Sequence, residues 1–435
     1  MPSRENCRLR SAGTAMRRVY APHPPPLEDL QFKSLYRKEI YDARTRDGWV
    51  LQIHRYRPVP QEWDQPILGE PILLVPGWSQ NRHAFTCATF VKRLLVFGAD
   101  CHIVELRGHG RSSRELQIEL CEKERRPLPR DLDWDWDLDS YLLGDIPAAV
   151  AAVKARSRRE KVVYLGNSMG GMLGYGYAGS HRDLAGLITI GAPSDIGRGF
   201  LLMRAAALFG PAMLGPLIDA LCVAATGLDS ARHGAAYALR RFGAGFLNHL
   251  ADAIAPEGAQ RRGVRFSHVP VDAILRQLAR ISTPDNLRRY ELVARHFGSL
   301  LNPARVTPEE FRWLLSQGGE KEPRRVVEQF ARWIRRDEMK CYRTGYDYKA
   351  HFRDIDCPMA VLFGDLDKIA SAKSTSSIYR NARSEYFLWR PVKDNSHLEL
   401  TVGYDLRQIC EDVKNLVEYA ARRERSPGAQ GRAEA

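Results

Sequence analysis

The stretch VVYLGNSMGGM, residues 162–172, decides the fold. Its first four residues form a short, continuous apolar run, which is typical of a strand buried on both faces. The next five read G-x-S-x-G, a pattern that needs small residues two positions before and after the serine when a strand turns sharply into a helix. Such a turn lifts the hydroxyl of Ser168 above the strand end, near the positive end of the helix. The plainer alternative is an ordinary strand-to-helix turn with an idle serine.

Strands and helices alternate on both sides of this stretch. Strand patterns cover residues 49–54, 71–75, 101–104, 162–165, 187–190, 359–363 and 385–389. Helical patterns cover residues 83–97, 140–153, 172–181 and 404–421. This alternation predicts an α/β fold with a mostly parallel central sheet and helices on both faces.

One long interval interrupts the alternation. About 160 residues of mainly helical pattern separate the strand ending at 190 from the one starting at 359, and a connection of that length needs structure of its own. We therefore expect a large inserted helical cap over residues 195–355. Residues 261–354 hold 20 basic and 12 acidic side chains, so much of the net charge of +13 belongs to this interval.

The remaining boundaries follow from composition. The core is predicted in two parts, 31–194 and 356–421. Residues 1–30 are rich in arginine and proline and are expected to form a flexible leader, and residues 422–435 are expected to form a disordered tail.

Composition excludes several classes of protein. The chain has 435 residues, of which 44% are hydrophobic and 27% charged, which excludes disorder throughout, collagen and coiled coil. Its eight cysteines form no C-x-x-C pair or tight cluster, so we expect no metal site and favour reduced thiols in the cytoplasm. The most apolar run, 205–218, is interrupted by two Gly-Pro pairs and is shorter than the roughly 20 residues of a transmembrane segment. The arginines are scattered and no nucleic-acid motif is present, so no nucleic-acid partner is expected.

A serine hydroxyl becomes a useful nucleophile only when a base takes its proton and a carboxylate orients that base. Two later loops carry such groups. Gly364-Asp365-Leu366-Asp367 follows the strand 359–363, and Asn395-Ser396-His397-Leu398 follows the last strand. In isolation, Asp367 could also cap a following helix, and His397 could be an ordinary surface histidine.

This arrangement resembles the serine hydrolases of the α/β-hydrolase fold, whose catalytic residues run in the order serine, acid, histidine. The resemblance implies that Ser168 is the nucleophile, flanked by Gly166 and Gly170, and that His397 is the base. The family's G-x-x-D pattern selects Asp367 over Asp365 as the acid.

The resemblance also implies an oxyanion hole made of two backbone N–H groups. One is the amide of Met169. The other is the amide of Trp78 in the loop Pro76-Gly77-Trp78, where family members often carry His-Gly instead of Pro-Gly. The turn 107–112 resembles a structural turn of the family, so His109 is expected to have no catalytic role.

A narrower resemblance connects the core with acid-lipase-type hydrolases. Asp47-Gly48-Trp49, Trp134-Asp135-Trp136-Asp137 and Ser396-His397-Leu398-Glu399 are similar to the opening hairpin, the segment before the nucleophile strand and the histidine loop of those enzymes. Asp145, after the second of these segments, is expected to be structural. The resemblance covers about 41–195 and 355–420 and leaves out the cap.

The function expected from the sequence is hydrolysis of a small-molecule carboxylic ester, with an acyl-enzyme intermediate and no cofactor. The apolar stretch 200–225 would suit a pocket for an apolar acyl chain, a patch that contacts a lipid surface, or a plain helical core. A serine nucleophile excludes haloalkane and epoxide chemistry, which requires aspartate on this fold. A thioesterase, a peptidase, an acyltransferase and a non-catalytic binding protein remain alternatives.

Overall fold

The computed structural model describes residues 36–59, 67–198, 267–281 and 300–425. The predicted leader, the apolar stretch 200–225 and residues 426–435 of the predicted tail lie outside the described residues.

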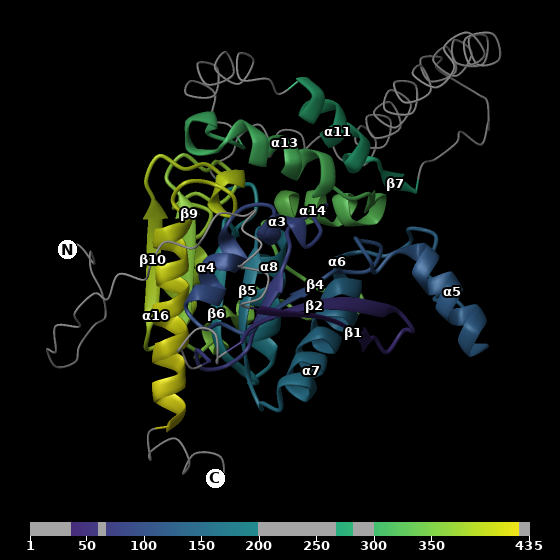
Figure 1. The fold of residues 1–435 in the computed structure, drawn as a ribbon, viewed down its shortest axis with the longest axis horizontal. Coiled ribbons are helices and arrows are strands. Elements are labelled where there is room, and N and C mark those ends of the chain that lie inside the picture. Colours follow the sequence, from purple (N-terminus) through teal and green to yellow (C-terminus); the bar gives the residue numbers. More distant parts are fainter. Residues whose placement is uncertain (1–35, 60–66, 199–266, 282–299, 426–435) are drawn as a thin grey trace, which may run out of the picture.

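A single eight-stranded sheet forms the centre of the molecule (Figure 1), with strand order β1-β2-β4-β3-β5-β6-β9-β10. The strands are β1 (Tyr36–Arg44), β2 (Val50–Pro58), β3 (Ile72–Val75), β4 (Cys101–Val104), β5 (Val162–Asn167), β6 (Leu184–Ile190), β9 (Met359–Gly364) and β10 (Phe387–Val392). Only β1 and β2 introduce antiparallel pairing, and every neighbouring pair from β4 to β10 is parallel. The predicted α/β class with a mostly parallel sheet is therefore confirmed.

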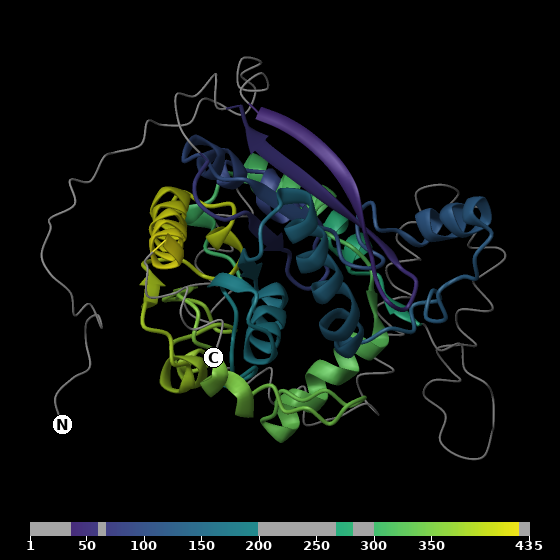
Figure 2. The ribbon, with the colours of Figure 1, turned by 90° about the horizontal axis from the view of Figure 1, so that it is seen from below.

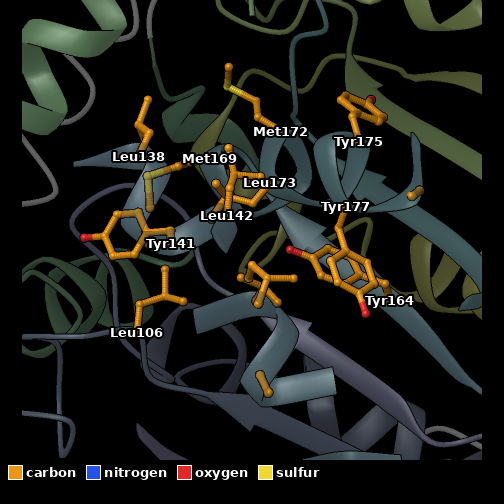
Figure 3. Close-up of a cluster of buried hydrophobic side chains, with 14 of the residues drawn as sticks. Leu106, Leu138, Tyr141, Leu142, Tyr164, Met169, Met172, Leu173, Tyr175 and Tyr177 are labelled. Carbon is orange, nitrogen blue, oxygen red and sulfur yellow. The ribbon is translucent and has the colours of Figure 1, made fainter. Parts of the chain in front are cut away.

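Helices cover both faces of the sheet (Figures 1 and 2), whereas α5 projects to one side of it (Figure 1). The helices before β6 and after β9 are α3 (His83–Thr86), α4 (Phe90–Val96), α5 (Arg114–Glu124), α6 (Leu138–Ser140), η1 (Tyr141–Asp145), α7 (Ile146–Ser157), α8 (Met169–Ser180), α15 (Ser376–Asn381) and α16 (Leu406–Arg425). Alternate residues of each buried strand enter two different apolar clusters, as the pleat of a strand requires. One cluster lies under α7 and α8, and part of it appears in Figure 3. The other lies under α4 and α16.

Some element boundaries differ from the sequence prediction. The helix expected over 83–97 is two helices, α3 and α4, and the regular apolar spacing gives no sign of the break. The helix expected over 140–153 starts with the π-helical turn η1. Within η1, a Cβ on Gly144 would lie 2.6 Å from Nη2 of Arg107, so the buried guanidinium occupies the space beside this turn. The last helix, α16, extends to Arg425, four residues beyond its predicted end.

After β6 the chain leaves the sheet and returns to the neighbouring position as β9, so we call residues 191–358 the β6–β9 connection. Its described elements are β7 (His268–Val269), α11 (Val271–Ile281), η2 (Pro303–Arg305), α13 (Pro308–Gln317), β8 (Glu322–Pro323), α14 (Arg324–Arg336) and η3 (Ala350–Asp354). Figure 1 shows α11, α13 and α14 grouped at one end of the sheet, close to α3. These elements are mainly helical, and the cap boundaries 195–355 remain a prediction. None of the helices in the described ranges is long and apolar enough for a membrane span.

Candidate active site

The turn after β5 holds Ser168 in a strained conformation. Its backbone has φ 50° and ψ −117°, in the region that L-residues rarely adopt. Crowding explains the two glycines around it. A Cβ on Gly166 would lie 2.4 Å from the carbonyl of Gly170, and a Cβ on Gly170 would lie 2.3 Å from the backbone oxygen of Val75. The turn can therefore close only with glycine at both positions.

Backbone hydrogen bonds hold the same turn. The amide of Ser168 donates to the carbonyl of Ile190 at 2.8 Å, and the buried hydroxyl of Tyr164 donates to the carbonyl of Gly170 at 2.6 Å. Helix α8 begins at Met169, three residues earlier than its apolar pattern predicts. The half-buried Ser168 is thus at the positive end of a helix, where developing negative charge is favoured.

The structure brings the three residues of the predicted triad into hydrogen-bond contact. Nε2 of His397 lies 2.9 Å from Oγ of Ser168, and Nδ1 of His397 lies 2.7 Å from Oδ2 of Asp367. Asp367 is almost fully buried, whereas the competing Asp365 is exposed. The shape of this chain of contacts is that required for a serine activated by an oriented imidazole.

The surroundings of Asp367 and His397 hold the two side chains in place. Oδ1 of Asp367 accepts hydrogen bonds from the amides of Ile369 and Ala370 at 2.7 and 2.9 Å, which leaves Oδ2 for the histidine. No helix begins there, because the next helix, α15, starts at Ser376. Burial disfavours charge on the imidazole, but the Asp367 carboxylate outweighs it and raises the pKa of His397.

The loop after β3 lies against the serine. A Cβ on Gly77 would lie 3.1 Å from Cβ of Ser168. Oε1 of Gln80 accepts hydrogen bonds from the amide of Gly77 at 3.0 Å and from Nδ2 of Asn167 at 2.9 Å, which links this loop to the nucleophile turn. The amides of Trp78 and Met169 donate to no other residue in the described ranges. Within these ranges both amides therefore lack a partner, as the donors of an oxyanion hole would before a ligand binds.

Comparison with known families agrees with this topology. The family profile described as the alpha/beta hydrolase fold matches residues 70–210, which include β3 to β6 and the serine turn. The chain has the α/β-hydrolase fold.

Solved structures with this fold resemble the chain only distantly. The complex of DcsB with its substrate analogue has 12% identity and a TM-score of 0.49, covering 88% of this chain and 100% of that one. An esterase from Thermogutta terrifontis has 15% identity and a TM-score of 0.46, covering 88% and 99%. An esterase from Exiguobacterium antarcticum has 17% identity and a TM-score of 0.44, covering 87% and 98%. No curated protein matches the chain.

Within this α/β-hydrolase fold, the two residues predicted to be structural are buried against charged side chains and do not contact the serine. Oδ1 of Asp145 lies 2.6 Å from Nη2 of Arg107, and both side chains are fully buried. His109 has no contact with the triad, and its Nε2 lies 3.3 Å from Oε1 of Glu322. In the described residues, no group of three or more metal-binding side chains gathers.

Sequence reasoning missed several residues of the site. Asn167 is the first of the two variable positions of the G-x-S-x-G motif, and Gln80 follows the predicted oxyanion residue by two positions. The signal that could have identified both residues is that each is a polar side chain in a loop expected to contribute to the oxyanion hole. Glu399 appears only as part of the histidine-loop resemblance, which predicts no role for it. Glu322, described below, carries no such signal, because nothing in its neighbouring sequence indicates that it lies near the site.

Proposed function

We propose that this protein is a serine hydrolase that cleaves carboxylic esters through an acyl-enzyme intermediate. One observation carries the proposal: a continuous line of contacts from Oγ of Ser168, through the His397 ring, to the buried carboxylate of Asp367, at 2.9 and 2.7 Å. This line of contacts begins at the strained turn after β5, where Ser168 is only partly buried.

Each residue has a defined part in the proposed reaction. Ser168 Oγ attacks the ester carbonyl carbon while Nε2 of His397 takes the hydroxyl proton. Asp367 accepts the hydrogen bond of Nδ1–H and stabilises the imidazolium. The His397 imidazolium then gives its proton to the leaving alcohol, and the acyl group stays on Ser168. A water molecule, deprotonated by the same nitrogen, releases the carboxylic acid.

The negative oxygen of the tetrahedral intermediate would be held by the amides of Met169 and Trp78. The first lies at the start of α8, where the helix dipole adds to its effect. Removing one such donor typically raises the barrier by about 3 kcal/mol.

The proposed substrate has an apolar acyl group, on the basis of the apolar stretch 200–225. A lipid surface is a further proposed partner of the same stretch. We propose a cytoplasmic location because the cysteine pattern lacks disulfide spacing, and the six cysteines in the described residues are free thiols. No cofactor enters the proposed reaction.

The proposal is tested by intact mass after treatment with a fluorophosphonate. We expect one adduct on the wild type, none on Ser168→Ala and one on Ser180→Ala, which removes an exposed hydroxyl at the far end of the same helix. Hydrolysis of p-nitrophenyl esters, from acetate to palmitate, should fall by roughly 10⁴-fold or more in Ser168→Ala and reveal the preferred acyl length. A folded wild type that forms no adduct and hydrolyses no ester would contradict the proposal and favour a binding protein.

A further inference from the structure

A short part of the β6–β9 connection pairs with the loop that follows β3. Gln80 forms an antiparallel bridge with Gly319, and the amide of Glu320 donates to the carbonyl of Ser79 at 2.9 Å. The hydroxyl of Ser79 in turn donates to the carbonyl of Glu320. This pairing brings the next acidic residue, Glu322, to the loop.

Glu322 is fully buried between three groups of the core. Its Oε1 accepts the amide of Ser79 at 2.7 Å, and its Oε2 accepts the hydroxyl of Tyr141 at 3.2 Å. Nε2 of the fully buried His109 lies 3.3 Å from Oε1. A buried carboxylate needs such partners, and its charge strengthens each hydrogen bond that it accepts.

The electrostatics of His109 reflect its acidic neighbours. Burial disfavours its imidazolium form, but the carboxylates of Glu322 and Glu320 outweigh that effect and raise the pKa of His109.

Three consecutive amides in the loop have different partners. The amide of Gly77 donates to Oε1 of Gln80, and the amide of Ser79 donates to Oε1 of Glu322. The amide of Trp78, between them, donates to no other residue in the described part of the chain. Ser79 has φ 57°, in the left-handed region, so the peptide group before it is held against its ordinary preference. The two outer hydrogen bonds fix the direction of the middle N–H.

We propose that Glu322 is a positioning residue that aims the Trp78 amide at the oxyanion, so that the β6–β9 connection completes the oxyanion hole. This inference rests on the proposed ester hydrolysis. Glu322 would act through Ser79 and would not touch the substrate.

The test compares Glu322→Gln with a matched variant, Asp139→Asn. Asp139 is also a fully buried carboxylate that joins the connection to the core, accepting Nε2 of Gln329 at 2.7 Å and the amide of Tyr342 at 2.8 Å. Among the described residues, Asp139 has no contact with the loop after β3. Replacing its carboxylate therefore disturbs a similar buried junction and leaves the hydrogen bonds of that loop unchanged.

Glu322→Gln leaves one neutral acceptor oxygen for the Ser79 amide and the Tyr141 hydroxyl, which in the wild type use two charged ones. We therefore expect kcat for an ester to fall roughly 10- to 100-fold while KM changes less than about threefold, because a misdirected donor affects the transition state most. The rate of fluorophosphonate labelling should fall by a similar factor, since the phosphoryl oxygen uses the same donors. Asp139→Asn should lower the thermal midpoint but keep kcat and the labelling rate within about threefold of wild type.

Tyr141→Phe is a gentler second variant, because it removes one hydrogen bond to Glu322 and leaves the carboxylate in place. Its kcat should fall a few-fold, and this variant decides the case if Glu322→Gln fails to fold. Equal kcat in wild type, Glu322→Gln and Tyr141→Phe would overturn the inference while leaving the hydrolase proposal intact. A folded wild type without labelling or hydrolysis would overturn both.

Discussion

The two sides of the candidate site are held by different forces. On the serine side, backbone atoms of the following helix crowd position 166 and those of the adjacent strand crowd position 170, so closely that only glycine fits at either. On the oxyanion side, side chains hold the loop, and the one that accepts the Ser79 amide comes from Glu322, 243 residues further along the chain. The glycine spacing of the turn is visible in a short stretch of sequence, even though one of the crowding atoms belongs to β3. A hydrogen-bonding side chain, in contrast, can come from any segment that folds over the loop.

The difference has consequences for substitution. Backbone atoms cannot yield without shifting a whole strand, so an added methyl group on the serine side should damage the entire fold. A hydrogen bond on the oxyanion side can be weakened without displacing an element, so a change there should reduce the rate and leave most of the stability.

The largest expected effect is that of Gly170→Ala. The new Cβ would lie 2.3 Å from the carbonyl oxygen of Val75, a backbone atom in the middle of the sheet. We expect a loss of stability of about 3 kcal/mol or more, together with loss of fluorophosphonate labelling. Denaturation in urea, followed by circular dichroism, measures the loss of stability.

The control is Gly176→Ala in the same helix, α8. Its Cβ would lie 2.8 Å from the end of the Leu142 side chain and 3.2 Å from the ring of Tyr348, and these are side-chain atoms, which can shift more easily than backbone. Alanine also favours a helix interior, so the net change should stay within about 1 kcal/mol. Equal stability losses in the two variants would show that backbone crowding does not control the serine turn.

The histidine loop is held by hydrogen bonds from two parts of the chain, the core and the β6–β9 connection. Asp367, at the end of β9, fixes the ring of His397. The carbonyl of Leu300, in the β6–β9 connection, accepts the amides of His397 and Leu398 at 3.3 and 2.9 Å. The base of the proposed reaction is therefore held by the core through its side chain and by the connection through its backbone.

Asp367→Asn removes the contribution of the core to the His397 side chain and leaves the backbone contacts with the β6–β9 connection in place. We expect kcat to fall roughly 10³- to 10⁴-fold, because an amide favours the wrong tautomer of the imidazole. The carboxylate raises the pKa of His397, so its removal leaves burial to lower that pKa. The neutral, basic form would then persist to lower pH, and the acidic limb of the kcat/KM profile should move down in pH.

The matched control is Asp365→Asn, two residues away on the same loop. Its carboxylate is exposed, and we expect the rate and the pH profile to match the wild type. A large loss of rate in Asp365→Asn, together with near-normal activity in Asp367→Asn, would show that Asp365 is the acid of the triad.

How much of this could be predicted from sequence depends on the distance over which each constraint acts. Apolar runs and the G-x-S-x-G spacing are local, so the sheet and the position of Ser168 in a turn after β5 follow from them directly. The break between α3 and α4 and the π-helical turn η1 are not marked by apolar spacing. Gln80 and Glu322 were missed because their importance lies in a partner that only the folded chain brings near.

The smallest expected effect concerns Glu399, whose buried carboxylate accepts the amide of Asn302 at 3.0 Å and that of Ser396. Its second oxygen has no hydrogen-bond partner among the described residues, and burial raises the pKa of this carboxyl to about 7. The folded state then holds a proton that the unfolded state releases near pH 4.5. The contribution of Glu399 to stability is therefore complete below pH 4.5, decreases as the pH rises and has been lost once the pH exceeds about 7.

Glu399→Gln should remove that slope while keeping an oxygen that can accept both amides. Compared with wild type, the free energy of unfolding of the variant should fall less between pH 4.5 and 7, by up to about 3 kcal/mol. Urea denaturation across this range gives the free energy of unfolding of each protein, and the difference between the two curves isolates Glu399. Burial raises the pKa of Asp412 to about 6 in both proteins, so the contribution of Asp412 cancels in that difference. Parallel curves would mean that the carboxylate is solvated, and that the polar junction between the histidine loop and the β6–β9 connection tolerates charge as freely as an exposed surface does.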